Sequence, residues 1–265
     1  MKSRISNKLS QLKKSGQKAF VPFITAGDPN LSTTEKLIYT LEKSGASVIE
    51  LGMPFSDPMA DGPTIQKANE RALKKGCTLK KILDLVKKVR KNSQIPILLM
   101  GYYNPVFQYG LKKFAQDCAK SGVDGLLIVD LPAEEAGPLR DAIKGKPIDI
   151  IYLITPTSDE KRLKLIKRYG SGFAYYVSFT GITGANRLNV SQVKQKLKTV
   201  RKHIKLPINI GFGISTPEHV RSLAPLADGV VVGSALIKRI EKHGTSSALF
   251  GSIEKYVKSL VKAAN

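Results

Sequence analysis

Short apolar runs alternate with longer amphipathic segments along the whole chain. The segments between the runs repeat apolar residues at helical spacing, as in 79–91, where positions 79, 82, 83, 86 and 89 form one face. Continuous apolar strands separated by helices are typical of a parallel sheet that is buried on both faces. The predicted strands are 20–25, 47–51, 95–100, 125–129, 149–154, 173–177, 208–211 and 229–233.

Eight strand–helix units in 265 residues fit the size of a (β/α)8 TIM barrel. A doubly wound sheet usually opens with a glycine-rich turn, whereas the first strand here leads into Thr25-Ala26-Gly27-Asp28-Pro29. No Pro/Ser/Gly linker divides the chain, so we predict one α/β barrel domain, 1–265, with short additional helices. Ile5, Leu9 and Leu12 recur at helical spacing and predict an extra N-terminal helix docked on the barrel.

Two local patterns add detail to the helices. Ser32-Thr33-Thr34-Glu35 has the form of a capping box and predicts a helix over 36–43. A single helix is predicted over 105–120, because Phe107, Leu111, Phe114 and Cys118 repeat on one side.

Composition narrows the class of protein. Hydrophobic residues make up 42% of the chain, enough for a substantial core, and no apolar stretch approaches the roughly 20 residues that span a bilayer. The first residues run into lysines rather than into the apolar core of a signal peptide. Two isolated cysteines, Cys77 and Cys118, fit the reducing cytoplasm, and the three histidines lack the spacing of metal ligands. We therefore expect a cytoplasmic protein with no membrane segment and no metal site.

The net charge of +22 at first suggests nucleic acid as a partner. The cations, however, occupy the polar faces of amphipathic helices, with no interleaved aromatic residues and no nucleic-acid motif. We predict a solvated basic surface without nucleic acid as a partner; its positive field would help to gather an anionic substrate.

Candidate chemistry lies at the predicted C-terminal ends of the strands, where barrel active sites form. Glu50 is a carboxylate inside an apolar strand, and Asp61 follows in a loop studded with acids and prolines. A buried carboxyl group is either costly or useful, so the pair indicates acid–base catalysis. A structural acid paired with a buried Lys or with backbone N–H groups is the alternative for Glu50, and a turn residue is the alternative for Asp61.

Glycines after the last strands predict a phosphate site. Gly211-Phe212-Gly213-Ile214-Ser215 follows the seventh strand, and Gly233-Ser234 follows the eighth at the start of a helix, where backbone N–H groups bind anions. Gly181-Ile182-Thr183-Gly184 is placed to close over the same anion as a lid. Tyr175 fits the barrel core and a ligand site equally well. Several strand-end residues are core candidates that also suit the walls of a flat apolar pocket: Phe23, Leu99, Leu127, Leu153 and Phe212.

Three segments carry a resemblance to a known family. They are Pro22-Phe23-Ile24-Thr25-Ala26-Gly27-Asp28-Pro29, the long block from Glu50 to Gln66, and 211–215. With Asp130-Leu131-Pro132 and 181–184, they closely resemble the tryptophan synthase α subunit over essentially the whole chain. The block from Glu50 to Gln66 is the most specific.

The resemblance implies a lyase that cleaves indole-3-glycerol phosphate into indole and glyceraldehyde 3-phosphate, in the last steps of L-tryptophan synthesis. Glu50 would move protons, and Asp61 would hold the indole N–H and offset its positive charge. Phosphate would lie at Gly184, Gly213, Gly233 and Ser234, and the pocket would include Tyr102, Thr183 and the residues named above. The subunit would use no cofactor.

The resemblance also implies a partner, a pyridoxal phosphate enzyme called the β subunit, in an α2β2 assembly. Segments 54–58 and 102–107 would face it, and the isolated chain would be slow. Two details depart from the family pattern. Phe179 stands where some members carry arginine, which leaves Arg187 as a candidate cation, and the segment 100–105 leaves the pocket residue of the third strand open between Leu98 and Leu99.

Two other functions remain possible at this point. Another phosphate-binding barrel of aromatic amino-acid synthesis, such as indoleglycerol-phosphate synthase or a phosphoribosyl isomerase, shares the phosphate site but lacks the Glu50 to Gln66 block. A non-catalytic basic barrel that activates its partner or binds nucleic acid is the second, and the retained Glu50 and Asp61 argue against it.

Overall fold

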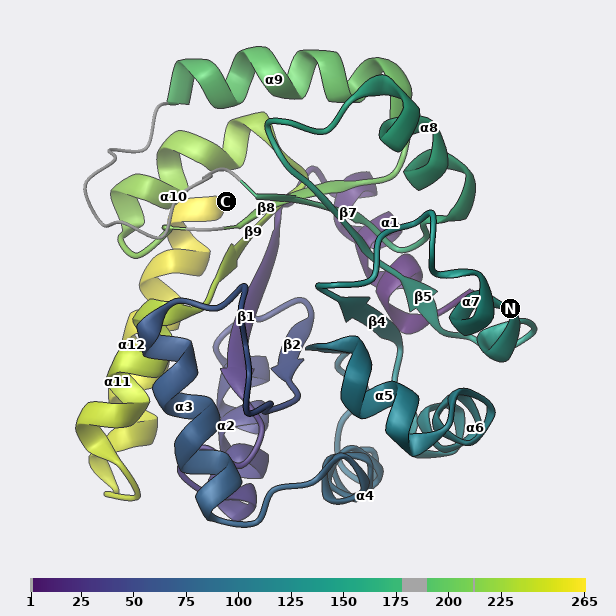
Figure 1. Ribbon diagram of the computed structural model, residues 1–265. Coiled ribbons are helices and arrows are strands. Elements are labelled where there is room, and N and C mark those ends of the chain that lie inside the picture. The colour runs from purple at the N-terminus through teal and green to yellow at the C-terminus, as the bar shows by residue number, and fades with distance from the viewer. Residues whose placement is uncertain (1, 178–189, 212) are drawn as a thin grey trace.

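A computed structural model describes residues 2–177, 190–211 and 213–265. Within these residues the strands form one parallel sheet with the order β5-β4-β3-β2-β1-β9-β8-β7-β6, and helices surround it (Figure 1). The strands are β1 (Ala19–Thr25), β2 (Ile49–Gly52), β3 (Ile97–Gly101), β4 (Gly125–Ile128), β5 (Asp149–Ile150), β6 (Tyr152–Ile154), β7 (Ala174–Val177), β8 (Ile208–Gly211) and β9 (Gly229–Val232).

The two ends of this sheet belong to one predicted strand. β5 pairs with β4 and β6 pairs with β7, and only Ile151 separates them. The Ile151 N–H still donates to the Leu126 carbonyl (2.9 Å), so pairing with β4 continues across the break. The sheet therefore closes into a barrel with eight strand positions, which confirms the predicted fold class.

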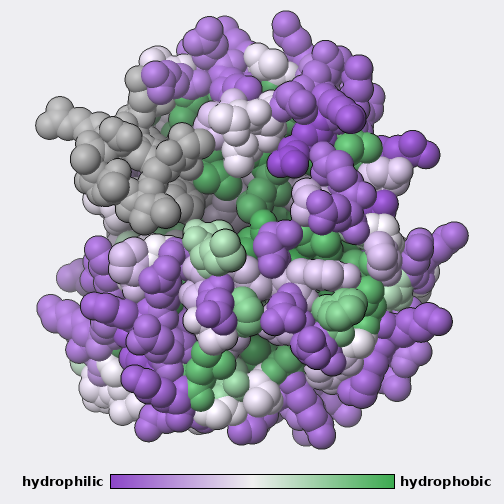
Figure 2. All heavy atoms as spheres, in the orientation of Figure 1, coloured by the Kyte–Doolittle hydropathy of each residue, from purple (hydrophilic) through white to green (hydrophobic). Residues whose placement is uncertain are grey.

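Helices occupy the crossovers and cover the outside of the barrel. In α4, Ile82, Val86 and Val89 are buried while the lysines are exposed, which explains the hydrophilic periphery in Figure 2. Across the described residues, no helix is both long and apolar enough to cross a membrane. The helices are α1 (Arg4–Lys14), α2 (Leu31–Lys43), α3 (Pro63–Lys74), α4 (Leu79–Val89), α5 (Tyr103–Tyr109), α6 (Leu111–Ser121), α7 (Gly137–Ile143), α8 (Glu160–Tyr169), α9 (Val190–His203), α10 (Pro217–Leu223), the 3-10 turn η1 (Ala224–Leu226), α11 (Ser234–His243) and α12 (Ala248–Ala264).

Apolar side chains form two clusters, as the alternation of strand side chains requires. The outer cluster joins strand residues to helix residues such as Leu37, Leu83 and Phe114. The inner cluster combines alternate strand residues, including Leu98 and Leu127, inside the barrel. In β3 the clusters follow this alternation, since Leu98 is inner and Leu99 is outer. In β1, Phe23 is grouped with the outer cluster, although alternation places it on the inner face with Ala19 and Val21.

The N-terminal helix closes one end of the barrel. Ile5 and Leu9 of α1 belong to the inner cluster, which confirms the predicted docked helix. Polar contacts fix it in place, because the Arg4 guanidinium pairs with the buried Asp124 (2.9 Å) and the Ser3 hydroxyl bonds to Asp149. The opposite end is left for the C-terminal strand ends and their loops.

Both local helix predictions need correction. The N-cap of α2 is Asn30, whose side chain accepts from the Thr33 N–H (2.8 Å), so the helix begins earlier than the capping box at 32–35 predicted. The helix expected over 105–120 is two helices, α5 and α6, separated by Gly110 at φ +88°. Phe107 lies before this break and is 59% exposed instead of sharing the buried face of Phe114.

Candidate active site

Glu50 lies on the inner face of β2. Its neighbours Ile49 and Leu51 belong to the outer cluster, so strand alternation turns Glu50 inward, where it is 1% exposed. Its Oε1 atom is buried with no hydrogen-bond partner among the described residues. Burial raises the pKa of Glu50 to about 8, and the charge of Asp61 adds to the rise. Among the described residues this oxygen thus has no partner of the kind that a structural acid would have, and the raised pKa leaves the carboxyl group mainly protonated at neutral pH.

Asp61 ends the loop that leads from β2 to α3. Burial raises its pKa to about 6, while hydrogen bonds from Tyr102 and Asn69 act in the opposite direction. The Asn69 Nδ2 atom donates to Asp61 Oδ2 (3.3 Å). At neutral pH Asp61 is therefore mainly ionised beside a protonated Glu50. Two nearby carboxyl groups in different protonation states are a common arrangement for acid–base catalysis.

Tyr102 holds the same loop from the end of β3. Its hydroxyl accepts the Ala60 N–H (3.0 Å), and its ring packs on Phe55 with 5.3 Å between ring centroids. Burial and the nearby Asp61 raise the pKa of Tyr102, so the phenol keeps its proton as a donor to Asp61. The structure therefore places Tyr102 against the loop that carries Asp61.

Tyr175 points into the barrel toward the strand that follows it. It belongs to the inner cluster, and a Cβ atom at Gly211 would lie 2.1 Å from its hydroxyl oxygen, so only glycine leaves room there. Burial raises the pKa of Tyr175, and the nearby Glu50 adds to that rise. Leu127 and Leu153 line the same interior. These three side chains share the inner cluster, and Tyr175 lies near Glu50.

Phe23 connects the two ends of the site. A Cβ atom at Gly52 would lie 2.7 Å from the Phe23 ring, and one at Gly233 would lie 3.4 Å from it. Gly52 is two residues beyond Glu50, and Gly233 precedes the first residue of α11. The predicted phosphate end and the predicted proton-transfer end therefore lie on either side of one aromatic ring.

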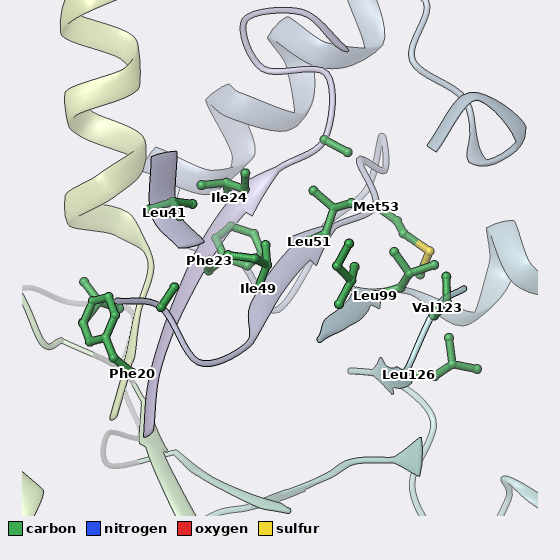
Figure 3. Close-up of a cluster of buried hydrophobic side chains, with 14 of the residues drawn as sticks. Phe20, Phe23, Ile24, Leu41, Ile49, Leu51, Met53, Leu99, Val123 and Leu126 are labelled. Carbon is green, nitrogen blue, oxygen red and sulfur yellow. The ribbon is translucent and has the colours of Figure 1, made fainter. Parts of the chain in front are cut away.

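Leu99 does not face this interior. It packs in the outer cluster beside Leu51 and Met53, as Figure 3 shows, while Leu98 belongs to the inner cluster. The prediction of Leu99 as a pocket residue is wrong, because neighbouring residues of a strand point to opposite faces. Leu98 is the inward residue of this pair in β3.

Glycines and a helix N-terminus make up the described part of the predicted phosphate site. Gly213 has φ +74°, a conformation that favours glycine, and Ser234 begins α11. The Tyr256 hydroxyl of α12 donates to the Ser215 carbonyl (2.7 Å) and holds the loop after β8. Thr183, Gly184 and Phe212, together with Phe179, Arg187 and the proposed lid, lie outside the described residues.

The sequence did not predict an ion-pair network that lies behind the site. Arg71 of α3 binds both oxygens of the buried Asp28 (2.8 and 2.9 Å) and reaches Glu241 of α11 (2.8 Å). It thereby links the helix that follows Asp61 to the helix that begins at Ser234. Among the described residues, no group of three His, Cys, Asp or Glu side chains could hold a metal ion.

A closed parallel barrel with two carboxyl groups near its C-terminal strand ends is typical of barrel enzymes. A family model, the tryptophan synthase alpha chain, matches residues 9–264. The chain is 54% identical to the tryptophan synthase alpha chain of Geobacter sp. strain M21, over 91% of this chain and 90% of the relative. It is 50% identical to that of Geobacter sulfurreducens, over 98% of each.

Solved structures agree with this match. Tryptophan synthase subunit alpha from Legionella pneumophila superposes with a TM-score of 0.93 at 39% identity, covering 100% of this chain and 99% of that one. A chain of the tryptophan synthase complex from Pyrococcus furiosus gives a TM-score of 0.84 at 37% identity, covering 93% and 99%. The chain belongs to the tryptophan synthase alpha chain family. It is a lyase that cleaves indole-3-glycerol phosphate in tryptophan synthesis, as predicted.

Proposed function

We propose that Glu50 and Asp61 divide the chemistry of this cleavage between them. The observation that supports the proposal is their contrasting protonation, since burial leaves Glu50 with a proton to give while Asp61 stays mainly ionised at neutral pH. Indole is a poor carbanion, so its C3 atom has to be protonated before the bond to the glyceryl carbon breaks. That step places positive charge on the ring, with a share on the nitrogen.

In the proposed sequence, protonated Glu50 gives its proton to C3, and ionised Asp61 accepts a hydrogen bond from the ring N–H and offsets the new charge. The Glu50 carboxylate then takes the proton of the glyceryl hydroxyl next to the breaking bond. The electrons of that bond return to the ring, which releases indole and glyceraldehyde 3-phosphate and leaves Glu50 protonated again. These proton transfers use no prosthetic group, and pyridoxal phosphate belongs to the β partner of the family's complexes.

The positions of the described site residues also suggest how the two ends of the substrate bind. We propose that Phe23, Leu127, Leu153 and Tyr175 flank the indole ring. The phosphate would lie at Gly213, Gly233 and Ser234, together with Gly184. The Phe23 ring, which contacts the strands on both sides, sets the separation between the two ends of the substrate.

Asp61→Asn tests the proposed charge stabilisation. We expect kcat for indole release to fall about 10²- to 10³-fold, as for the loss of one group that stabilises transition-state charge, with a smaller change in KM. Asparagine keeps the shape of the side chain but cannot oppose the ring charge. Steady-state indole release from indole-3-glycerol phosphate measures the effect.

Glu70→Gln is the matched control, because Glu70 is an exposed carboxylate of the adjoining helix α3. It should leave kcat within about twofold of wild type, as expected for a surface change. Turnover by Asp61→Asn at the wild-type rate would remove Asp61 from the mechanism.

We also propose that the chain binds a tryptophan synthase β subunit in an α2β2 assembly. A related structure is that of the a2b2 complex of Pyrococcus furiosus, described as mutually activating, at 38% identity. Two large apolar side chains are conspicuously exposed near the site, Met59 at 86% in the loop after β2 and Phe107 at 59% in α5 after β3. Exposed apolar residues in the segments that follow two neighbouring strands suit a protein interface.

Phe107→Asp is expected to weaken β-subunit binding at least about tenfold, because an interface aromatic residue is typically a large contributor to affinity. Titration of the chain with β subunit, followed by the rise in indole production, measures this. The basal rate of the isolated variant should equal that of the isolated wild type. Leu73→Asp is the control, since Leu73 is an exposed apolar residue of α3 away from these loops. Equal stimulation of the Phe107 variant and wild type would contradict the proposed interface.

We further propose that the protein works in the cytoplasm. Cys77 and Cys118 are both free and buried, and burial raises the pKa of Cys77 to about 11 and raises that of Cys118 as well. Two inert, unpaired thiols suit a reducing compartment.

A further inference from the structure

The helix that follows the catalytic loop buries one polar side chain among small apolar ones. The buried residues of α3 are Ala68, Asn69 and Ala72, and Asn69 is 4% exposed. Asparagine is a weak helix former, and burying its amide costs free energy unless the amide makes hydrogen bonds. Asn69 therefore needs a hydrogen-bond partner that offsets the cost of burying its amide.

That partner is the Asp61 carboxylate. The Asn69 Nδ2 atom lies 3.3 Å from Asp61 Oδ2 and can only donate. A donor to a carboxylate favours its charged form. Asn69 thus acts against the burial that raises the pKa of Asp61.

The backbone of Asp61 is held by different groups. Its N–H donates to the Pro58 carbonyl (3.0 Å), and its own carbonyl accepts from Gln66 Nε2 (2.8 Å). The loop geometry therefore has its own supports. Asn69 instead acts on the Asp61 side chain, because it fixes the direction of the carboxylate and favours its charged form.

The other titratable groups that act on Asp61 come from neighbouring strands. Glu50 faces it from β2, and Tyr102 donates to it from the end of β3, while Asp130 after β4 acts on Tyr102. Tyr102 also accepts the Ala60 N–H and packs on Phe55, so its phenol serves several contacts. Asn69 anchors the Asp61 carboxylate to helix α3, which is more rigid than a short loop.

We propose that Asn69 is a positioning residue for the cleavage reaction, which keeps the Asp61 carboxylate ionised and aimed at the indole N–H. This inference rests on the proposed role of Asp61. It predicts that loss of the amide changes the pH dependence of turnover, which a purely structural residue would not do.

Asn69→Leu tests the inference, because leucine has a similar volume and no donor. The acid limb of the kcat/KM profile for indole release, expected near pH 6 in the wild type, should move upward by about one pH unit, while the alkaline limb stays in place. Asn69→Asp keeps the shape and adds a like charge, so it should move the limb in the same direction and further. If the leucine variant does not fold, the acid limb of Asn69→Asp alone tests the inference.

Gln66→Leu is the matched control, because it removes a hydrogen bond to the Asp61 backbone instead of the carboxylate. It should leave the acid limb in place. In an Asp61→Asn background, Asn69→Leu should change kcat/KM less than about twofold, because the two residues act as one unit.

These variants distinguish failure of the Asn69 inference from failure of the proposed role of Asp61. An unmoved acid limb in both Asn69 variants, with kcat of Asp61→Asn still lowered as expected, would overturn the inference and leave the proposed function intact. A wild-type acid limb and rate in Asp61→Asn would overturn the proposed role of Asp61 and the inference with it.

Discussion

Replacing Glu50 by glutamine is expected to lower kcat for indole release about 10²- to 10⁴-fold, the range for loss of a general acid–base group. Glutamine has nearly the same shape and fits the same buried site, but it can neither give a proton to C3 nor take one from the glyceryl hydroxyl. Because the substrate still meets the same apolar walls and phosphate site, KM should change much less than kcat. Steady-state indole release, with and without the β subunit, provides both constants.

The pH profile of the wild type gives an independent check on this role. Activity should require a protonated Glu50 and an ionised Asp61, so kcat/KM should rise through pH 6 and fall above pH 8. Glu70→Gln should reproduce both limbs, since that carboxyl group lies on the exposed face of α3. Undiminished turnover by Glu50→Gln would show that another group moves the protons.

The sequence alone predicted the barrel well, because most strands are short apolar runs between amphipathic helices. Because neighbouring residues of these strands are all apolar, the sequence does not show which of them face the barrel interior. Leu98 and Leu99 are both fully buried, one inside the barrel and one against the helices, so apolarity alone could not choose between them. Glu50 was recognisable because its polarity breaks such a run.

Helix details were predicted less well, for local reasons. Gly110 adopts a positive φ that ends α5, but the apolar spacing continues across it. Asn30 caps α2, although Ser32 to Glu35 also has the form of a cap. Competing local signals of nearly equal strength are decided by tertiary packing, which periodicity does not contain.

Contacts between distant segments left no signal in the sequence. Asn69 is one of many polar residues in helices, and only the fold shows that it is buried against Asp61. Arg71 is likewise one cation among 43, and its bonds to Asp28 and Glu241 join residues 43 and 170 positions away. Glu50 could be proposed as a catalytic group because a carboxylate is unusual in an apolar strand, whereas Asn69 and Arg71 are ordinary in type for helix residues.

Glu50 should also cost the protein stability, in a way that depends on pH. It is 1% exposed, its Oε1 has no hydrogen-bond partner among the described residues, and its pKa is raised from 4.5 to about 8. Between these two values the folded chain holds a proton that the unfolded chain has released. Folding therefore weakens as pH rises from 4.5 to 8, at up to about 1.4 kcal/mol per pH unit from this group.

Glu50→Gln removes that dependence, because glutamine does not titrate. The free energy of unfolding of the variant minus that of the wild type should be smallest near pH 5, grow steadily to pH 8 and level off above it, reaching a few kcal/mol. Urea unfolding of both proteins at pH 5 to 9 measures the difference, and subtraction removes the contribution of every other titrating group. Glu70→Gln should give a difference independent of pH. A flat difference for Glu50→Gln would mean that the buried carboxyl group titrates normally, and it would then have no proton to give to C3 at neutral pH. The stability lost at Glu50 and the proton transfer proposed for it would therefore have one physical origin, the burial of its carboxyl group.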